Sequence, residues 1–179
     1  MQDFLGFVKD FIQKKGIQYS WLDSERFKIS PLLSSRLSSL LDGKAFIVVT
    51  DDERAWFEDY FLSLVNAKSA RPLLPFFSLK GFKLDNYEKN EDLLDDVLSL
   101  SYPNGYIYIY FGKDNSKMAK LAKNKKDSLL FILDEEYDNS FCLKSSDEHL
   151  DIKLITIAQL INACLDAIVF AKVKIWEVR

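Results

Sequence analysis

Hydrophobic residues follow two different periods along the chain, and the period changes near residue 44. Before that point, apolar residues recur every three or four positions, which predicts helices over residues 2–15 and 24–41. Pro31 falls inside the second segment, so we expect a kink or a break near Ser30. The first part of the chain is therefore predicted to be purely helical.

From residue 44 onwards, short apolar runs alternate with helical patterns. The runs that predict strands cover residues 44–50, 73–79, 105–111 and 128–133. Helices are expected over residues 52–66, 92–100, 113–123 and 152–173, with a less regular segment at 134–149. Strands that alternate with helices favour an α/β fold, a parallel β-sheet with helices on both faces in a three-layer sandwich. The connections are expected to be right-handed crossovers.

Length and composition indicate a single globular domain. The chain has 179 residues, and 48% of them are hydrophobic, which is enough for a full core. We expect one α/β domain over residues 1–179. It consists of N-terminal helices (1–43), a βα core (44–133), and an irregular segment followed by a C-terminal helix (134–179).

Charge narrows the range of partners. The net charge of −3 and pI of about 5.3 provide no general attraction to nucleic acid or to an anionic membrane. Charged or amide residues interrupt every apolar stretch before it reaches the ~20 residues of a membrane span. We therefore expect a soluble, cytoplasmic protein that binds neither a membrane nor a specific nucleic-acid sequence.

The first strand-to-helix turn lacks the features of a phosphate-binding loop. In nucleotide- and phosphosugar-binding α/β proteins, glycines and hydroxyls at this turn hold a phosphate against the helix N-terminus. Here the turn reads Asp51-Asp52-Glu53-Arg54 and contains no glycine. Asp51 or Asp52 can cap the helix with its own side chain, and Glu53 favours the same end of the helix dipole. The sequence thus predicts the scaffold of a ligand-binding fold without its anion site.

Candidate catalytic and metal-binding residues are few. His149 is the only histidine, and no nucleophile in a recognised motif accompanies it. Cys142 and Cys164 have apolar neighbours and do not form a CxxC pair, so we expect two reduced, partly buried thiols. We therefore expect no enzyme activity, no cofactor and no metal, and protein binding becomes the favoured function.

Aromatic residues on the helix at 52–66 give the best indication of an interface. Trp56 and Tyr60 share one face of this helix, and Phe57 and Phe61 share the next. One stripe suffices for the core of a single chain, so the other is expected to contact a second subunit or a partner protein. Core packing of both stripes is the alternative.

The last predicted helix is apolar around most of its circumference. Ile161, Leu165 and Ile168 lie on one side, and further aliphatic residues lie on the other. Such coverage fits a helix that is buried on two sides, as assembly of subunits would provide.

Two charged segments remain. The lysines at 113, 117, 120 and 123 share one face of a predicted helix, which favours a solvated surface, with DNA backbone or an acidic partner as the alternative. The acidic run from Glu88 to Asp96 favours helix-dipole stabilisation, with steering of a basic partner as the alternative.

Two segments resemble the HobA family of bacterial regulators of replication initiation, which bind the initiator DnaA. They are Arg54-Ala-Trp-Phe-Glu-Asp-Tyr-Phe-Leu-Ser-Leu-Val-Asn66, and Ala70-Arg-Pro-Leu-Leu-Pro75 before the second strand. The second segment is also similar to the wider sugar isomerase (SIS) fold. Members of that fold carry a Gly/Ser-rich phosphate loop where this chain has Thr50-Asp51-Asp52-Glu53.

The resemblance implies an SIS-like fold, a homotetramer, and binding of several DnaA N-terminal domains around that tetramer at the replication origin. The residues then expected to bind the partner are Arg54, Trp56, Tyr60, Phe82 and Leu165. The residues expected at the oligomer interface are Phe57, Phe61, Ile161 and Ile168. The alternatives are a sugar-phosphate isomerase or sensor of the SIS type and an oligomeric scaffold for another partner.

Overall fold

A parallel five-stranded sheet forms the centre of the molecule. The computed structural model describes residues 2–67, 70–81 and 91–175. The strand order in the sheet is β3-β2-β4-β5-β6. The strands are β2 (Ala45–Thr50), β3 (Phe76–Ser78), β4 (Tyr106–Lys113), β5 (Leu129–Leu133) and β6 (Ser140–Leu143).

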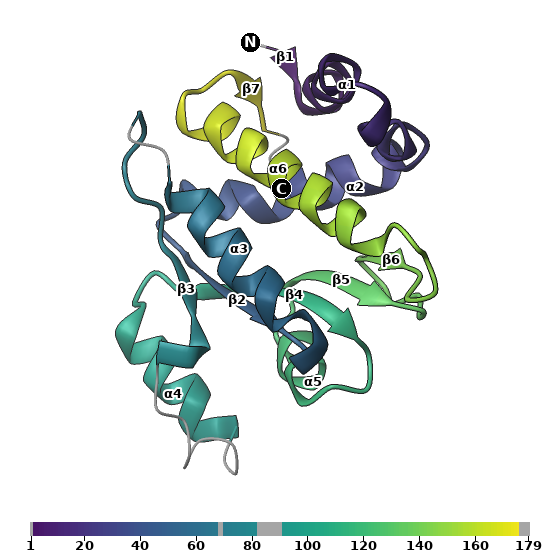
Figure 1. Ribbon diagram of the computed structural model, residues 1–179. Coiled ribbons are helices and arrows are strands. Elements are labelled where there is room, and N and C mark those ends of the chain that lie inside the picture. Colours follow the sequence, from purple (N-terminus) through teal and green to yellow (C-terminus); the bar gives the residue numbers. More distant parts are fainter. Residues whose placement is uncertain (1, 68–69, 82–90, 176–179) are drawn as a thin grey trace.

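Helices cover both faces of the sheet, as Figure 1 shows. One face packs against α2 (Trp21–Leu37), α3 (Ala55–Asn66) and α6 (Leu150–Val169), and α1 (Phe4–Lys15) packs against α2 and α6 in the same core cluster. The other face packs against α4 (Glu91–Ser101) and α5 (Lys117–Asn124). Short 3₁₀ turns lie at Ile17–Tyr19, Ser38–Leu40, Asp52–Arg54 and Leu79–Gly81. The expected three-layer α/β sandwich is therefore confirmed.

The central strands are apolar throughout because both of their faces are buried. In β2, Phe46 and Val48 pack under α3 and α6, whereas Ile47 and Val49 pack under α4 and α5. All of these side chains are at most 2% exposed. A continuous apolar run, in place of an alternating one, is the sequence signal of such a strand.

The four strands expected from the sequence are present, and the sheet has a fifth that we did not predict. β6 lies within the segment expected to be irregular and pairs in parallel with β5. It has only four residues, and Ser140 and Cys142 alternate with the buried Phe141 and Leu143. This short half-polar pattern falls below the length at which periodicity separates a strand from a loop.

Of the predicted kink or break near Ser30, the break is wrong, because α2 continues through Pro31 as one helix. Leu32 and Leu33 beside the proline are at most 9% exposed, so core packing holds the helix together where one backbone hydrogen bond is missing. The other boundary differences are smaller. α2 begins at Trp21, β4 extends to Lys113 so that α5 starts later than expected, and α6 ends at Val169.

A second, two-stranded sheet joins the two ends of the described chain. β1 (Gln2–Asp3) pairs in parallel with β7 (Val173–Lys174), and Gln2 lies opposite Val173. This pairing holds the start of α1 beside the segment that follows α6.

α6 is the central helix of the larger core. By length and composition alone its 20 residues meet the requirements for crossing a membrane, but 61% of its most apolar window is buried inside the molecule. Leu154, Ile157 and Ile161 are at most 1% exposed and pack in the same cluster as the sheet residues. The apolar character of α6 is thus explained by its place in the core.

Candidate functional site

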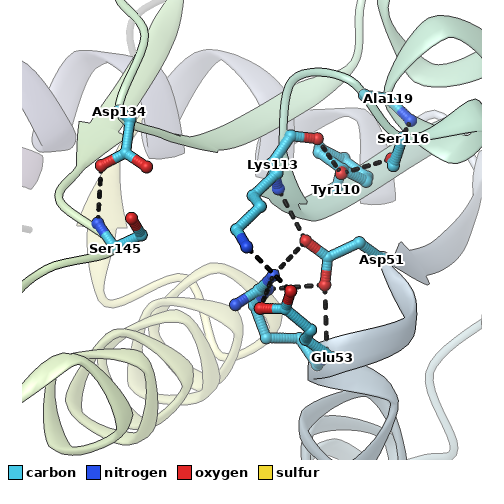
Figure 2. A network of polar contacts seen from close by, with 9 residues as sticks. Asp51, Glu53, Tyr110, Lys113, Ser116, Ala119, Asp134 and Ser145 are labelled. Carbon is cyan, nitrogen blue, oxygen red and sulfur yellow. Dashed lines mark hydrogen bonds and ion pairs between the residues drawn. The ribbon is translucent and has the colours of Figure 1, made fainter.

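The carboxyl ends of β2, β4 and β5 meet at one edge of the sheet, where ligand sites of parallel α/β folds usually lie. Asp51 follows β2, Lys113 ends β4, and Asp134 follows β5. Figure 2 shows Asp51 and Lys113 joined by a hydrogen bond, with Asp134 set apart from them beside Ser145. The chemistry of this edge therefore depends on what their side chains bind.

Asp51 is the centre of the polar network at this edge. Its Oδ1 accepts hydrogen bonds from the backbone N–H of Arg54 at 3.2 Å and from Arg54 Nε at 2.6 Å. Its Oδ2 forms an ion pair with Arg54 Nη2 and accepts the backbone N–H of Lys113 at 2.7 Å. Asp51 therefore caps the turn that leads into α3, which confirms one of the two capping residues considered from the sequence.

A second carboxylate completes this network. Glu53 Oε1 lies 2.8 Å from Lys113 Nζ, and Glu53 Oε2 lies 3.1 Å from Arg54 Nη2. Hydrogen bonds from Lys113 and then Arg54 lower the pKa of Glu53 below its ordinary value. Burial raises the pKa of Tyr110 to about 12, and its hydroxyl donates to the carbonyl of Lys113 at 2.6 Å. The charges at this edge are thus largely neutralised within the chain.

Asp134 is held in the same way. Its Oδ1 accepts the backbone N–H of Ser145 at 2.7 Å, and hydrogen bonds from the side chain and then from the backbone of Ser145 lower the pKa of its carboxyl group. Among the described residues, no group of three His, Cys, Asp or Glu side chains is arranged to hold a metal ion. The carboxylates at this edge serve as caps and ion-pair partners.

α3 starts at this edge, and its two aromatic stripes have different environments. Phe57 and Phe61 are fully buried and pack edge-on or tilted against Phe111 of β4, with ring centroids 4.7 and 5.7 Å apart. Trp56 is 42% exposed. Tyr60 is half-buried, and its hydroxyl accepts a hydrogen bond from Gln159 of α6 at 3.4 Å. One stripe is therefore core and the other is surface.

Two of the remaining partner-binding candidates, Arg54 and Leu165, are not on this surface. Arg54 is 6% exposed, and its guanidinium binds Asp51 and Glu53. Leu165 is fully buried in α6. Phe82 lies outside the described residues. The structure thus places Trp56 and Tyr60 at or near the surface, whereas Arg54 is buried and paired with acidic residues of its own turn.

All four residues expected at an oligomer interface lie in the core of the single chain. Phe57, Phe61 and Ile161 have no exposed surface, and Ile168 is 3% exposed. A second chain has no access to these side chains in this conformation. The apolar width of α6 and α3 is instead satisfied by α1, α2 and the sheet.

Sequence reasoning gave no role to Arg71, which binds α6 to the end of α3. Its Nη1 lies 2.5 Å from Asp166 Oδ1, and its Nη2 lies 2.6 Å from Asn162 Oδ1. Its Nη2 also donates to the carbonyl of Val65. The only signal in the sequence was the Arg71-Pro72 pattern. It formed part of the family resemblance but did not show which residues Arg71 contacts.

Other charged candidates have structural partners. His149 is exposed, and its backbone N–H donates to Asp147 at 2.8 Å. Lys123 pairs with Asp114 at 2.5 Å, and Lys125 pairs with Asp95 at 3.4 Å. These contacts fit a solvated surface for the lysine-rich helix and for Asp95 of the acidic run, of which residues 88–90 lie outside the described part of the chain.

Comparison with known proteins gives consistent matches over the whole chain. A family model described as "HobA: DNA replication regulator" matches residues 1–175. The DNA replication regulator protein HobA of Helicobacter pylori is 28% identical over 183 residues, covering 98% of this chain and all of that protein.

Solved structures agree. The chain is similar to the crystal structure of HobA from Helicobacter pylori and to HobA in a complex with domains I–II of DnaA from the same organism. In both cases the TM-score is 0.77 at 28% identity, covering 97% of this chain and 99% of the other.

Proposed function

Because this chain belongs to the HobA family of DNA replication regulators, we propose that it regulates the initiation of chromosomal replication by binding the N-terminal region of DnaA. The complex between the Helicobacter pylori relative and DnaA domains I–II supports this choice of partner. We further propose that binding promotes the oligomeric assembly of DnaA at the origin, in the cytoplasm.

The exposed ring of Trp56 is the observation that carries the proposed binding surface. Trp and Tyr dominate binding hot spots because they bury a large area with little loss of side-chain entropy. Trp56 packs edge-on against Phe57, which is fully buried, with ring centroids 5.6 Å apart. The helix therefore presents Trp56 and Tyr60 from a rigid base, which reduces the entropic cost of docking.

The base under this surface is unusually well fixed. At the start of α3, Asp51 and Arg54 are joined by two hydrogen bonds and an ion pair. In the middle of the helix, Tyr60 contacts Gln159, whose side-chain oxygen accepts the hydroxyl of Tyr19. At its end, Arg71 binds the carbonyl of Val65. Arg54 thus acts as a positioning residue for Trp56.

A homotetramer would turn this surface into several equal sites. Several copies of one site hold several DnaA N-terminal domains at a high effective concentration, so that assembly is promoted without any new chemistry. The side chains that join the subunits must be exposed ones. Ile17 and Phe27 of the α1–α2 region are 90% and 63% exposed, and they are candidates for that role.

We propose that the protein is not an enzyme. The edge of the sheet where an SIS-type isomerase would hold a sugar phosphate has its backbone donors bound to Asp51 and carries Asp52 and Glu53 beside it. An incoming phosphate would meet like charges and occupied donors. This arrangement disfavours the sugar-phosphate alternative.

The test is binding of purified DnaA domains I–II to the wild type and to Trp56→Ala, measured by isothermal titration calorimetry. Loss of a hot-spot tryptophan typically costs ~2 kcal/mol or more, so we expect the Kd to rise about 30-fold. Light scattering coupled to size exclusion gives the stoichiometry. A tetramer that gains several copies of domains I–II is the expected result.

Phe170→Ala is the matched control, because Phe170 is an aromatic residue with similar exposure, 47%, at the end of α6. It should bind DnaA like the wild type. Failure of the wild-type protein to bind domains I–II would refute the proposed partner. An unchanged Kd in Trp56→Ala would refute the proposed surface but leave the partner in place.

A further inference from the structure

The donors around Asp51 form the kind of cradle that proteins use to bind anions. Two backbone N–H groups, from Arg54 and Lys113, and two nitrogens of the Arg54 guanidinium converge on one carboxylate. Backbone amides at the start of a helix combined with an arginine fork are a common donor set for carboxylates and phosphates. Here the bound group belongs to the chain itself.

The cradle is buried and fully engaged. Asp51 is 8% exposed and Arg54 is 6% exposed. The Arg54 guanidinium is positioned from one side by Asp51 and from the other by Glu53 Oε2 at 3.1 Å. Loss of the Asp51 carboxylate would be destabilising, because the buried guanidinium would keep only the exposed Glu53 as a charged partner.

Gly112 makes room for the carboxylate. A Cβ atom at this position would lie 2.6 Å from Asp51 Oδ2 and 2.5 Å from the hydroxyl of Tyr110. The backbone of β4 can therefore approach the carboxylate as closely as a glycine-rich loop approaches a bound phosphate. A glycine is required here because both the Asp51 carboxylate and the Tyr110 hydroxyl lie where a Cβ atom would be.

A path from solvent leads to the cradle. Asp51 and Lys113 line an open groove of about 460 Å³, together with Thr50, Ser116 and Lys117. The same groove is lined by Asp52 and Glu53, so it does not attract a second anion while Asp51 is present. Removing one negative charge changes that balance and leaves an opening through which a small ion can reach Arg54.

We propose that this edge of the sheet is an anion-binding site whose ligand is built into the chain, namely the Asp51 carboxylate. Shortening Asp51 leaves a site for one small oxyanion, held by Arg54 and by the backbone N–H of Lys113. The inference does not depend on DnaA binding. It concerns the position at which other members of this fold class would hold a free anion.

The test is thermal unfolding of Asp51→Ala in sodium formate and in sodium chloride at equal ionic strength and neutral pH. Formate matches in size the carboxylate that this substitution removes. We expect Asp51→Ala to have a lower Tm than the wild type in chloride. Formate should raise that Tm saturably by ~3 °C or more, whereas the wild type should respond equally to both salts.

Two controls separate a cradle from a general salt effect. Asp147→Ala also removes a carboxylate that accepts a backbone N–H and pairs with a basic residue, Lys153, but a lysine offers only a single point charge in place of a guanidinium fork. Its Tm should not respond to formate. The double variant Asp51→Ala/Arg54→Met lacks the guanidinium and should also lose the response.

If Asp51→Ala is unfolded in chloride, the same salts are compared by the fraction of folded protein in far-ultraviolet circular dichroism. Recovery of folded protein in formate supports the proposal. No recovery, an equal response to chloride, or an equal gain in either control variant overturns it.

Discussion

The guanidinium of Arg71 and the carboxylate of Asp166 form an ion pair in which Nη1 lies 2.5 Å from Oδ1. The Arg71 side chain is 1% exposed and the Asp166 side chain 23%. The pair joins the segment before β3 to the end of α6. These two segments lie on either side of α3, which carries the proposed binding surface.

Asp166→Ala should destabilise the protein by ~2–4 kcal/mol, because it leaves a buried guanidinium with hydrogen bonds but without its counter-charge. Urea unfolding at neutral pH measures this loss. Glu25→Ala, which removes the exposed partner of Lys28, should change the free energy of unfolding by less than ~0.5 kcal/mol. Equal effects of the two substitutions would show that the Arg71 pair is no stronger than a surface pair.

Glu58 makes the free energy of unfolding depend on pH, and the direction of its shifted pKa fixes the sign of this dependence. Burial raises its pKa above the ordinary value of 4.5. This effect outweighs the hydrogen bonds from Ser78 and Thr50 and the charge of Lys80, all of which lower the pKa. At pH values between the unfolded and the folded pKa, the Glu58 carboxyl group is therefore protonated in the folded chain but ionised in the unfolded chain. The stability from this group is fully present below about pH 4.5 and is lost as the pH rises through the folded pKa.

Glu58→Gln removes this dependence. The free energy of unfolding of the wild type minus that of Glu58→Gln should fall as the pH rises from about 4 to 7. Asp95 and Asp147 have lowered pKa values, which act in the opposite direction, but they do so equally in both proteins and cancel in the difference. A difference that stays flat or rises with pH would contradict the assignment.

Gly112→Ala should destabilise the protein by ~2 kcal/mol or more, because the new Cβ would lie 2.6 Å from an Asp51 oxygen that Arg54 and Lys113 hold in place. Chemical denaturation measures the effect. At Gly6, within α1, a new Cβ would lie 3.0 Å from the end of the exposed Asp3 side chain. Gly6→Ala should therefore stay within ~1 kcal/mol of the wild type, since the gain in helix propensity offsets this contact.

The two cysteines should react at very different rates. Cys164 is fully buried in α6, and burial raises its pKa strongly. Cys142 lies half-buried on β6, and its pKa is raised mainly by partial burial. Iodoacetamide followed by intact mass analysis should label Cys142 alone in the folded protein and both thiols in denaturant. Double labelling without denaturant would mean that the core around α6 opens.

Sugar phosphates should leave the Tm of the wild-type protein unchanged. A ligand at 100 times its Kd stabilises a protein by about 2.7 kcal/mol, so a binding site would be evident in a thermal shift assay. A panel of pentose, hexose and heptose phosphates at millimolar concentration is sufficient. A saturable rise in Tm with one of them would support the sugar-phosphate alternative and contradict a filled cradle.

The fold was predictable where burial leaves a simple pattern. β4 reads Tyr-Ile-Tyr-Ile-Tyr-Phe from Tyr106 to Phe111, and such a run marks a strand buried on both faces. β6 has four residues of mixed burial and carries no comparable signal. At Pro31, tertiary packing keeps the helix continuous although proline disfavours a helix interior. The sequence shows this local preference but not the packing that overrides it.

The site was predictable in part. Spacing showed that Trp56 and Phe57 lie on different stripes of α3, but both are aromatic, so spacing alone could not decide which stripe is core. The contacts of Phe57 with Phe111 decide it. Similarly, the sequence showed that Asp51 could act as a cap, but the donation from Lys113 depends on the pairing of β2 with β4.

The central place of α6 has a consequence for biosynthesis. α1 and α2 leave the ribosome first, yet the cluster that buries Phe4, Val8 and Leu33 also contains Leu154, Ile157 and Ile161. These early helices cannot complete their packing until α6 has been translated. During most of translation, the apolar side chains of these two helices therefore lack their partners on α6, so the nascent chain exposes apolar surface until α6 is made.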